Sequence, residues 1–149
     1  MTLLSVSHRK QRQPADCLPT CAAMVLDYLQ ISNRYDHLVR LLQLTPYGAP
    51  FRNLQKLESL GVSVLVSQGD MDTLRLHLET GLPLLVPVET HWLQYWDVDT
   101  YHVLVVVGIE DDRVFVNDPW FDEAPMAISS NEHVPAWVEQ QNLYAVISL

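Results

Sequence analysis

The residues best suited to chemistry lie in the stretch QRQPADCLPTCAAM, which spans residues 11–24 and holds both cysteines of the 149-residue chain. Cys17 falls at the expected start of a helix, where unpaired backbone N–H groups and the helix dipole favour a thiolate over a thiol. Cys17 is therefore a candidate nucleophile. The alternative interpretation is a buried structural cysteine, because cysteine is among the residues most often found inside proteins.

Cys21 lies one turn further along, on an apolar stripe with Met24, Val25 and Tyr28. This position indicates a core residue. The CxxxC spacing differs from that of zinc knuckles and CxxC redox sites, and no second cluster of ligands follows. We therefore expect no metal, no other cofactor and no disulfide.

A cysteine nucleophile needs a base, and the chain offers six histidines, namely His8, His37, His77, His91, His102 and His133. His102 is singled out because it begins the apolar run YHVLVVVGI, where an unpaired imidazole would be costly. A catalytic base and a structural, hydrogen-bonded histidine are both consistent with this position.

The segment after His102 contains a candidate partner. The run YHVLVVVGIEDDRVFVND is typical of a hairpin with its turn near Asp111, which would place residue 118 opposite residue 104. Asp118 would then be a diagonal neighbour of His102 on the same face, able to orient the imidazole in a nucleophile–base–orienter triad. Asp118-Pro119 is also typical of a turn after a strand.

Acyl transfer needs hydrogen-bond donors for the oxyanion as well. The backbone N–H of Cys17 is one candidate, and a side-chain amide upstream is the other. Gln11 and Gln13 both have the required chemistry, and the residues alone leave this choice open.

The elements that position these residues form a mixed set. Helices are predicted at 19–29 with Asp16 as a cap, from the Ser32-Asn33 cap to 42, at 51–60 before Gly61, from the Asp70 cap to 79, and at 132–140. Strands are predicted at 62–66, 82–88, 101–109, 113–117 and 143–149. The run VLVVVGI is apolar throughout, so it should lie mid-sheet with both faces covered. The predicted fold class is α+β, with an N-terminal helical lobe packed on a mainly antiparallel sheet.

Composition bounds the class of protein. The length predicts one domain over residues 1–149, with a helical lobe at about 16–60 and a sheet lobe at about 61–149. The net charge of −9 argues against nucleic acid as a partner. We expect no membrane insertion and no secretory signal, and hence a cytoplasmic protein with reduced thiols.

Charge and aromatic residues are unevenly distributed. Residues 1–78 hold eight of the nine basic residues, and residues 79–149 hold twelve of the eighteen acidic ones. If the two halves face each other across a cleft, its walls would differ in sign, the alternative being a solvated acidic surface. The aromatic-rich segment His91–Trp96 either lines a substrate groove or covers the core.

Together these residues resemble the papain-like cysteine peptidases of family 39, the bacteriocin-processing group that removes double-glycine leader peptides. The N-terminal motif of that family is matched by Gln11, Asp16, Cys17, Cys21, Ala23 and Met24, and its later His and Asp-Pro are matched by His102 and Asp118-Pro119. The resemblance, which covers about residues 11–120, implies a papain-like fold.

The resemblance also implies roles. Cys17 would be the nucleophile, His102 the general base and then acid, Asp118 the orienter, and Gln11 rather than Gln13 the oxyanion amide. Leu18-Pro19 stands where the family usually has Gly-Pro or Gly-Leu, so we expect the loop at Cys17 to be less open to a bulky acyl group.

The predicted function is a cysteine peptidase or amide hydrolase that acts on a peptide or protein substrate through a thioester acyl-enzyme, with leader-peptide processing as one form of it. In bacteriocin systems the peptidase is fused to an ABC exporter, and this sequence has neither membrane helices nor a nucleotide-binding loop. Two alternatives stay open. One is an acyltransferase that uses the same acyl-enzyme, and the other is a catalytically silent peptide-binding module of the same fold.

Overall fold

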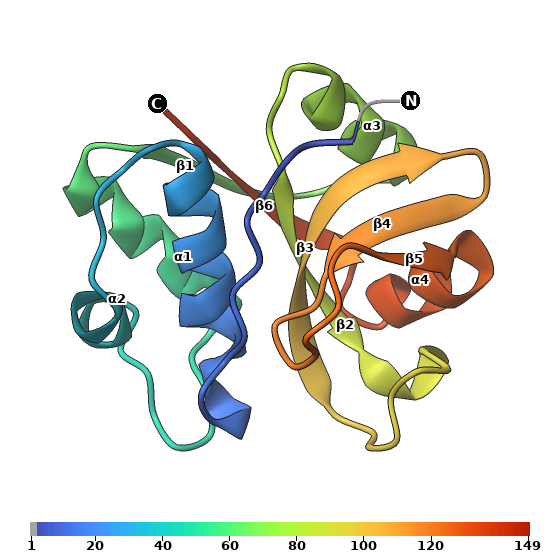
Figure 1. Ribbon diagram of the computed structural model, residues 1–149, viewed down its shortest axis with the longest axis horizontal. Helices are drawn as coiled ribbons and strands as arrows, with labels where there is room; N and C mark the ends of the chain where they lie inside the picture. The colour runs from blue at the N-terminus through green and yellow to red at the C-terminus, as the bar shows by residue number, and fades with distance from the viewer. Residues whose placement is uncertain (1–2) are drawn as a thin grey trace.

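The computed structural model describes residues 3–149, so Met1 and Thr2, the first residues of the segment considered for a secretory signal, lie outside it. One antiparallel sheet with the strand order β1-β6-β2-β3-β4-β5 runs through the molecule (Figure 1). Its strands are β1 (Ser63–Gln68), β2 (Leu84–Glu89), β3 (Tyr101–Glu110), β4 (Arg113–Asn117), β5 (Met126–Ser129) and β6 (Leu143–Ser148).

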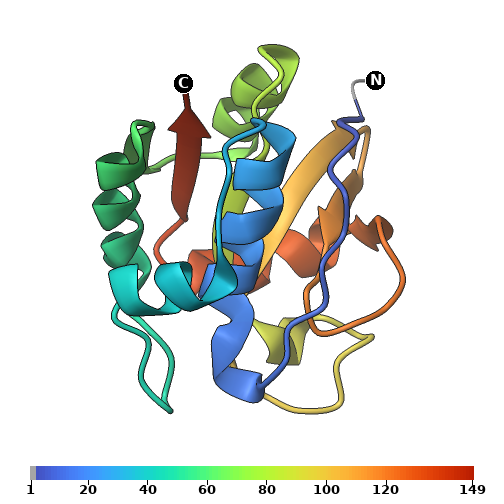
Figure 2. The same ribbon diagram turned by 60° about the vertical axis from the view of Figure 1, so that its left-hand side comes forward.

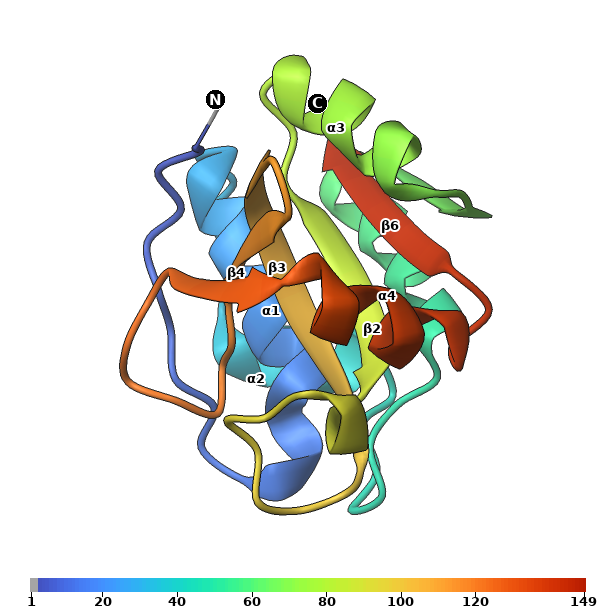
Figure 3. The same cartoon turned by 90° about the vertical axis from the view of Figure 1, so that its right-hand side faces the viewer.

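Helices cover both faces of this sheet. The helical segments are η1 (Pro14–Asp16), α1 (Cys17–Tyr28), α2 (Tyr35–Leu41), η2 (Phe51–Leu60), α3 (Met71–Glu79), η3 (Thr90–Trp92) and α4 (Ser130–Val138). The N-terminal lobe of α1, α2 and η2 packs on one face (Figure 2), and α3 and α4 pack on the other (Figure 3). This arrangement confirms the predicted α+β class. Within residues 3–149, no helix combines the length and the apolar character needed to cross a bilayer.

The central strand β3 joins the two layers of the core. Val103, Val105 and Val107 belong to the hydrophobic cluster around α1, whereas Leu104 and Val106 belong to the cluster under α3 and α4. Successive side chains of a strand point to opposite faces, so a strand covered on both sides is apolar at every position. The predicted mid-sheet position of VLVVVGI is confirmed.

Local capping signals explain several boundaries. Asp70 Oδ1 accepts a hydrogen bond from the Thr73 backbone N–H at 2.9 Å, and the Thr73 hydroxyl completes a capping box at the start of α3. Ser129 Oγ accepts from the Asn131 N–H at 3.1 Å at the start of α4. These predicted helix starts depend on residues three or fewer positions apart, so the sequence is sufficient to find them.

The predicted caps of the first two helices are wrong. Asp16 makes no capping hydrogen bond, because η1 leads directly into α1 and the backbone of Asp16 is not extended as a cap requires. The first helix therefore begins at Cys17, earlier than predicted. Ser32-Asn33 does not cap α2, which begins at Tyr35, and the Asn33 amide donates instead to Asp27 Oδ1 at 2.9 Å.

Two other elements differ from the prediction. The segment Phe51–Leu60 is a 3₁₀ helix rather than an α-helix, although Gly61 ends it as expected, in the left-handed region at a φ of 91°. Strand β5 was not predicted. It has four residues, of which only Ile128 is buried, so its sequence carries too little alternation to indicate a strand.

Candidate active site

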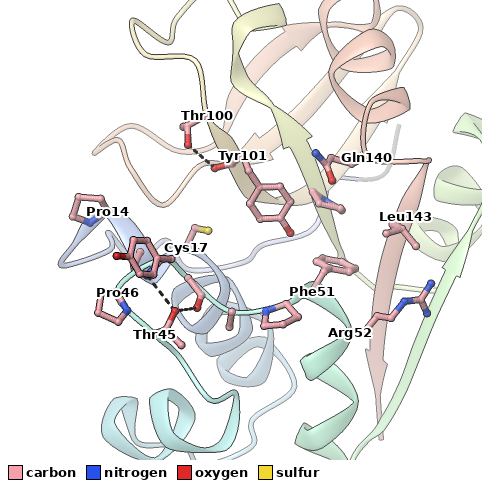
Figure 4. Close-up of a pocket in the computed structure, with 16 residues that line it drawn as sticks. Pro14, Cys17, Thr45, Pro46, Phe51, Arg52, Thr100, Tyr101, Gln140 and Leu143 are labelled. Carbon is pink, nitrogen blue, oxygen red and sulfur yellow. Dashed lines mark hydrogen bonds between the residues drawn. The ribbon is translucent and has the colours of Figure 1, made fainter.

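Cys17 is the first residue of α1, where the unpaired N–H groups of the helix lie. Its side chain is 8% exposed and lines a cavity of about 740 Å³. Figure 4 shows it entering this cavity from the helix start, with Phe51 and Pro46 on the helical side and Tyr101, Gln140 and Leu143 on the sheet side. The nucleophile predicted from the sequence is therefore buried but reachable from a cleft.

The charge of this cavity differs from the predicted pattern. Among the described residues that line it, Arg52 of η2 is the basic one, and none is acidic. The sheet side contributes Pro87, Tyr101 and Gln140 but no carboxylate. Of the two alternatives that the sequence left open, two walls of opposite sign are not found among the described residues of this cavity.

Leu18 does not narrow the entrance to Cys17. Its side chain is 2% exposed and belongs to the hydrophobic cluster around α1, and it does not line the cavity. The expectation that Leu18 makes the loop less open is therefore wrong, because the helix turns this residue toward the core.

Cys21 is fully buried, and its Sγ donates to the carbonyl oxygen of Val103 at 3.4 Å. Burial raises the pKa of the Cys21 thiol well above its ordinary value, and the nearby charges of Cys17 and Asp118 act in the same direction. Both cysteines are free thiols. The prediction that Cys21 is a core residue is confirmed.

His102 and Asp118 form a buried pair. The Nε2–H of His102 donates to Asp118 Oδ1 at 2.7 Å. The strands β3 and β4 pair Val105 with Asn117, which agrees with the predicted register and makes Asp118 a diagonal neighbour of His102. The pairing inferred from the hairpin is thus confirmed, although a bulge between Val106 and Gly108 shifts the register nearer the turn.

The environment of His102 favours the imidazolium. Burial acts to lower its pKa, but the interactions with Asp118 and Cys17 outweigh burial and raise the pKa to about 9. Because Nε2 is bound to Asp118, Nδ1 is the ring nitrogen left to face Cys17. A protonated His102 between Asp118 and Cys17 can stabilise both the Asp118 carboxylate and a Cys17 thiolate.

Asp118 is held by four donors. Its Oδ1 accepts from His102 and from the Trp120 N–H at 3.0 Å, and its Oδ2 accepts from the Tyr95 hydroxyl and the Trp96 Nε1–H, both at 2.8 Å. Burial opposes ionisation, yet the hydrogen bonds from His102, Trp120 and Trp96 keep the pKa of Asp118 below its ordinary value. Burial and the charge of Asp118 raise the pKa of Tyr95, so its hydroxyl stays a donor.

Tyr95 and Trp96 are residues of the candidate site that the sequence did not identify. The Trp96 ring also packs over the His102 ring, with centroids 4.6 Å apart. The segment His91–Trp96 was predicted only to line a groove or cover the core, and Trp96 does both, whereas Trp92 is 43% exposed. The sequence offered only a general signal for these two residues. A buried carboxylate needs several hydrogen-bond donors, and the segment contributes two, the Tyr95 hydroxyl and the Trp96 Nε1–H.

Gln11 is buried and lines a second cavity with His102, whereas Gln13 is exposed. The structure therefore brings Gln11, not Gln13, to the site. The Gln11 Nε2 donates to the carbonyl oxygens of Gln13 at 2.7 Å and Pro14 at 3.1 Å. Its Oε1 is buried with no hydrogen-bond partner among residues 3–149.

The N-terminal segment before α1 connects both sides of the site. The Gln11 backbone N–H donates to the Pro119 carbonyl at 2.7 Å, directly after Asp118. The Asn117 amide, directly before Asp118, donates to the Val6 carbonyl at 3.0 Å. These bonds fix the loop that carries Gln11 relative to the strand that carries Asp118.

One group of potential metal ligands occurs among the described residues. Ligand atoms of Glu89, His91 and Glu139 lie within 4.8 Å of one another. His91 Nε2 and Glu139 Oε2 are 3.3 Å apart. This group includes neither Cys17 nor His102, so none of the chemistry considered for those residues passes through it.

Comparison with known proteins adds a family and several structures. No curated protein matches the chain closely enough to count as a relative. A putative C39-like peptidase from Bacillus anthracis is similar at a TM-score of 0.80 and 14% identity, over 99% of this chain and 97% of that one. The peptidase domain of Streptococcus ComA, a bifunctional ABC transporter involved in quorum sensing, is similar at a TM-score of 0.74 and 19% identity, over 99% and 98% of the two chains.

A double-glycine-motif protease from an AMS/PCAT transporter, solved in complex with its leader peptide, matches at a TM-score of 0.74 and 14% identity, over 98% of this chain and 93% of that one. At these identities the likeness establishes the papain-like fold. The family is shown by sequence, since the peptidase C39 family model matches residues 5–141. The chain belongs to the peptidase C39 family.

Proposed function

We propose that this protein is a cysteine peptidase that cleaves peptides through a thioester acyl-enzyme, with Cys17 as nucleophile, His102 as proton donor and acceptor, and Asp118 as the orienting carboxylate. The observation that carries the proposal is the His102–Asp118 pair at 2.7 Å, with Nδ1 of the ring left for Cys17. Family membership supports the general class of activity.

The first half of the reaction forms the thioester. The Cys17 thiolate attacks the carbonyl carbon of the scissile amide, and the Cys17 N–H and the Gln11 amide stabilise the oxyanion. His102 then donates its Nδ1 proton to the leaving amine, the C–N bond breaks, and the thioester remains on Cys17.

The second half releases the acyl group. Neutral His102 takes a proton from water, the hydroxide attacks the thioester, and the thiolate leaves. The raised pKa of His102, about 9, means that the imidazole begins the cycle protonated at neutral pH. In this protonation state His102 acts as an acid first and a base second, the reverse of the order that the resemblance implies.

We infer that the substrates are leader peptides with a double glycine before the scissile bond. The support is family membership and the fold shared with a double-glycine-motif protease that was solved with its leader peptide. The acyltransferase alternative uses the same thioester and differs only in the acceptor. Product analysis with and without an added amine distinguishes the two.

The proposal is tested by labelling and cleavage. A thiol-directed electrophile such as iodoacetamide should modify Cys17 in the folded protein and leave Cys21 unmodified, as mass spectrometry of the digested protein can establish. Cys17→Ala should lower cleavage of a double-glycine peptide by about 10³-fold or more. Cys21→Ala is the matched control and should cleave at close to the wild-type rate. Equal cleavage by Cys17→Ala and wild type would refute the proposal.

One observation favours a second candidate, the silent peptide-binding module. Both donors of the Gln11 amide are engaged by the carbonyl oxygens of Gln13 and Pro14, so an oxyanion must displace one of these bonds. In a silent module, Cys17→Ala would leave peptide affinity unchanged, and no cleavage would occur with either protein.

A further inference from the structure

A second cavity, of about 380 Å³, lies on the His102 side of the cleft. Pro14, Thr100 and Tyr101 line both this cavity and the larger one that contains Cys17, so the two are neighbouring parts of one cleft. Figure 4 shows Pro14 and Thr100 at the edge of the larger cavity and the Tyr101 ring extending toward its middle. His102 and Gln11 line the smaller cavity and have roles in the proposed reaction, whereas Asp97 and the Trp120 side chain, which also line it, have none.

The chemistry of the reaction sets the direction of the substrate, and this step rests on the proposed function. The acyl group stays on Cys17, whereas the leaving amine must approach the proton donor, His102. The segment before the scissile bond therefore lies in the larger cavity, and the first residue after that bond lies in the smaller one.

The walls of the smaller cavity combine aromatic residues with one acidic residue. Trp96 and Trp120 line it, with ring centroids 6.1 Å apart and planes 25° apart, and Trp120 is 38% exposed. Apart from His102, Asp97 is the charged residue among the described residues that line this cavity. The charge of His102 is already compensated by Asp118 at 2.7 Å.

Two basic residues lie next to the smaller cavity, beyond Trp120. Lys10 and Arg12 line a separate cavity with Trp120. The Lys10 ammonium is paired with Asp122 at 3.2 Å, and Arg12 lies over the Tyr35 ring at 4.3 Å. Both basic side chains beyond Trp120 are thus engaged elsewhere, and the acidic Asp97 lies on the His102 side of Trp120.

We propose that this cavity, bounded by Trp96, Trp120 and Asp97, binds the cationic side chain of an Arg or Lys that directly follows the scissile bond. Aromatic faces attract a cation through their quadrupole, and a carboxylate at the rim adds an ion pair. The preference applies to the first residue after the scissile bond, which is the residue that the smaller cavity receives.

The test compares two peptides that differ only in the residue after the double glycine, Arg in one and citrulline in the other. Citrulline keeps the shape of arginine and removes its charge. We expect kcat/KM to favour the Arg peptide by about fivefold to tenfold, which corresponds to about 1–1.4 kcal/mol. Asp97→Asn should remove most of this preference, mainly by lowering kcat/KM for the Arg peptide.

Asp122→Asn is the matched control, because Asp122 is an exposed carboxylate that does not line the cavity. It should keep the preference for Arg. Equal cleavage of the two peptides by the wild type would overturn the inference, as would equal effects of Asp97→Asn and Asp122→Asn.

Failure of the proposed function is distinguishable from failure of this inference. If no peptide is cleaved, the peptidase proposal fails, and binding is measured in Cys17→Ala by tryptophan fluorescence. The cation site is supported if quenching saturates at a lower concentration of the Arg peptide than of the citrulline peptide. This difference should disappear when Asp97→Asn is added to the Cys17→Ala protein. Identical titrations with the two peptides contradict it.

Discussion

His133 lies on α4 in the apolar layer opposite the helical lobe, fully buried against the Trp137 ring at a centroid distance of 5.6 Å. Neither ring nitrogen has a hydrogen-bond partner among residues 3–149. Burial lowers the pKa of His133 to about 4, and no nearby charge contributes. We expect this side chain to make the protein sensitive to mild acid.

The sign follows from the two states of the protein. In the unfolded chain His133 takes up a proton near pH 6.5, whereas in the folded protein it does so only near pH 4. Stability is therefore fully present above about pH 6.5 and is lost as the pH falls toward about 4. A difference of about 2.5 pKa units amounts to about 3 kcal/mol in total, of which about 2 kcal/mol is lost by about pH 5.

The measurement is urea unfolding of the wild type and His133→Phe at several pH values between about 7.5 and 5. Phenylalanine keeps the ring and removes both unpaired nitrogens, so the variant should be at least as stable as the wild type near pH 7.5. Near pH 5 its advantage should be larger by about 2 kcal/mol.

Two further variants complete the experiment. His37→Phe changes an exposed histidine on α2 and should leave the pH dependence of stability unchanged. His133→Leu replaces His133→Phe if the larger ring overpacks the site. The reasoning about burial is refuted if the difference in unfolding free energy between the wild type and the His133 variants stays constant across this pH range.

The other predictions concern the site and one loop. Asp118→Asn should lower the pKa of His102 from about 9, as an NMR titration can measure. An unchanged titration midpoint would exclude Asp118 as the cause of the raised pKa. In the wild type, the stability that His102 contributes should be lost as the pH rises from about 6.5 to about 9. Gln11→Glu replaces the amide with a carboxylate, which can donate neither to the two loop carbonyls nor to an oxyanion. This variant should reduce kcat by about 10²-fold or more, and a wild-type kcat would refute an oxyanion role for Gln11. Gly69→Ala should destabilise the fold by about 1–3 kcal/mol in urea unfolding, because its Cβ would lie 2.8 Å from Thr73 Cβ, and an unchanged midpoint would contradict this.

Elements whose determinants are close in sequence were predictable. The Asp70 capping box, the left-handed Gly61 and the doubly covered strand β3 each depend on a few neighbouring residues or on an uninterrupted apolar run. The errors arose where a neighbouring element decides the local structure. Asp16 fails as a cap because it is the last residue of η1, and β5 pairs with the edge that β4 offers.

The sequence also predicted that His102 and Asp118 come together. Hairpin geometry alone is sufficient to relate His102 to Asp118, because the turn near Asp111 sets the register between β3 and β4. Chemistry alone left Gln11 and Gln13 equivalent. Burial separates them, and burial depends on the packing of the N-terminal segment against the Pro119 loop.

What the sequence by itself determined is the set of reactive groups and the local rules that place them: a thiol at a helix start, an imidazole at the start of a buried strand, and a carboxylate across a hairpin. Only the tertiary structure decided the environment of these groups. Tyr95 and Trp96 reach Asp118 from a loop more than twenty residues away in sequence. No local pattern encodes that contact, because it exists only once η3, β3 and β4 are packed together.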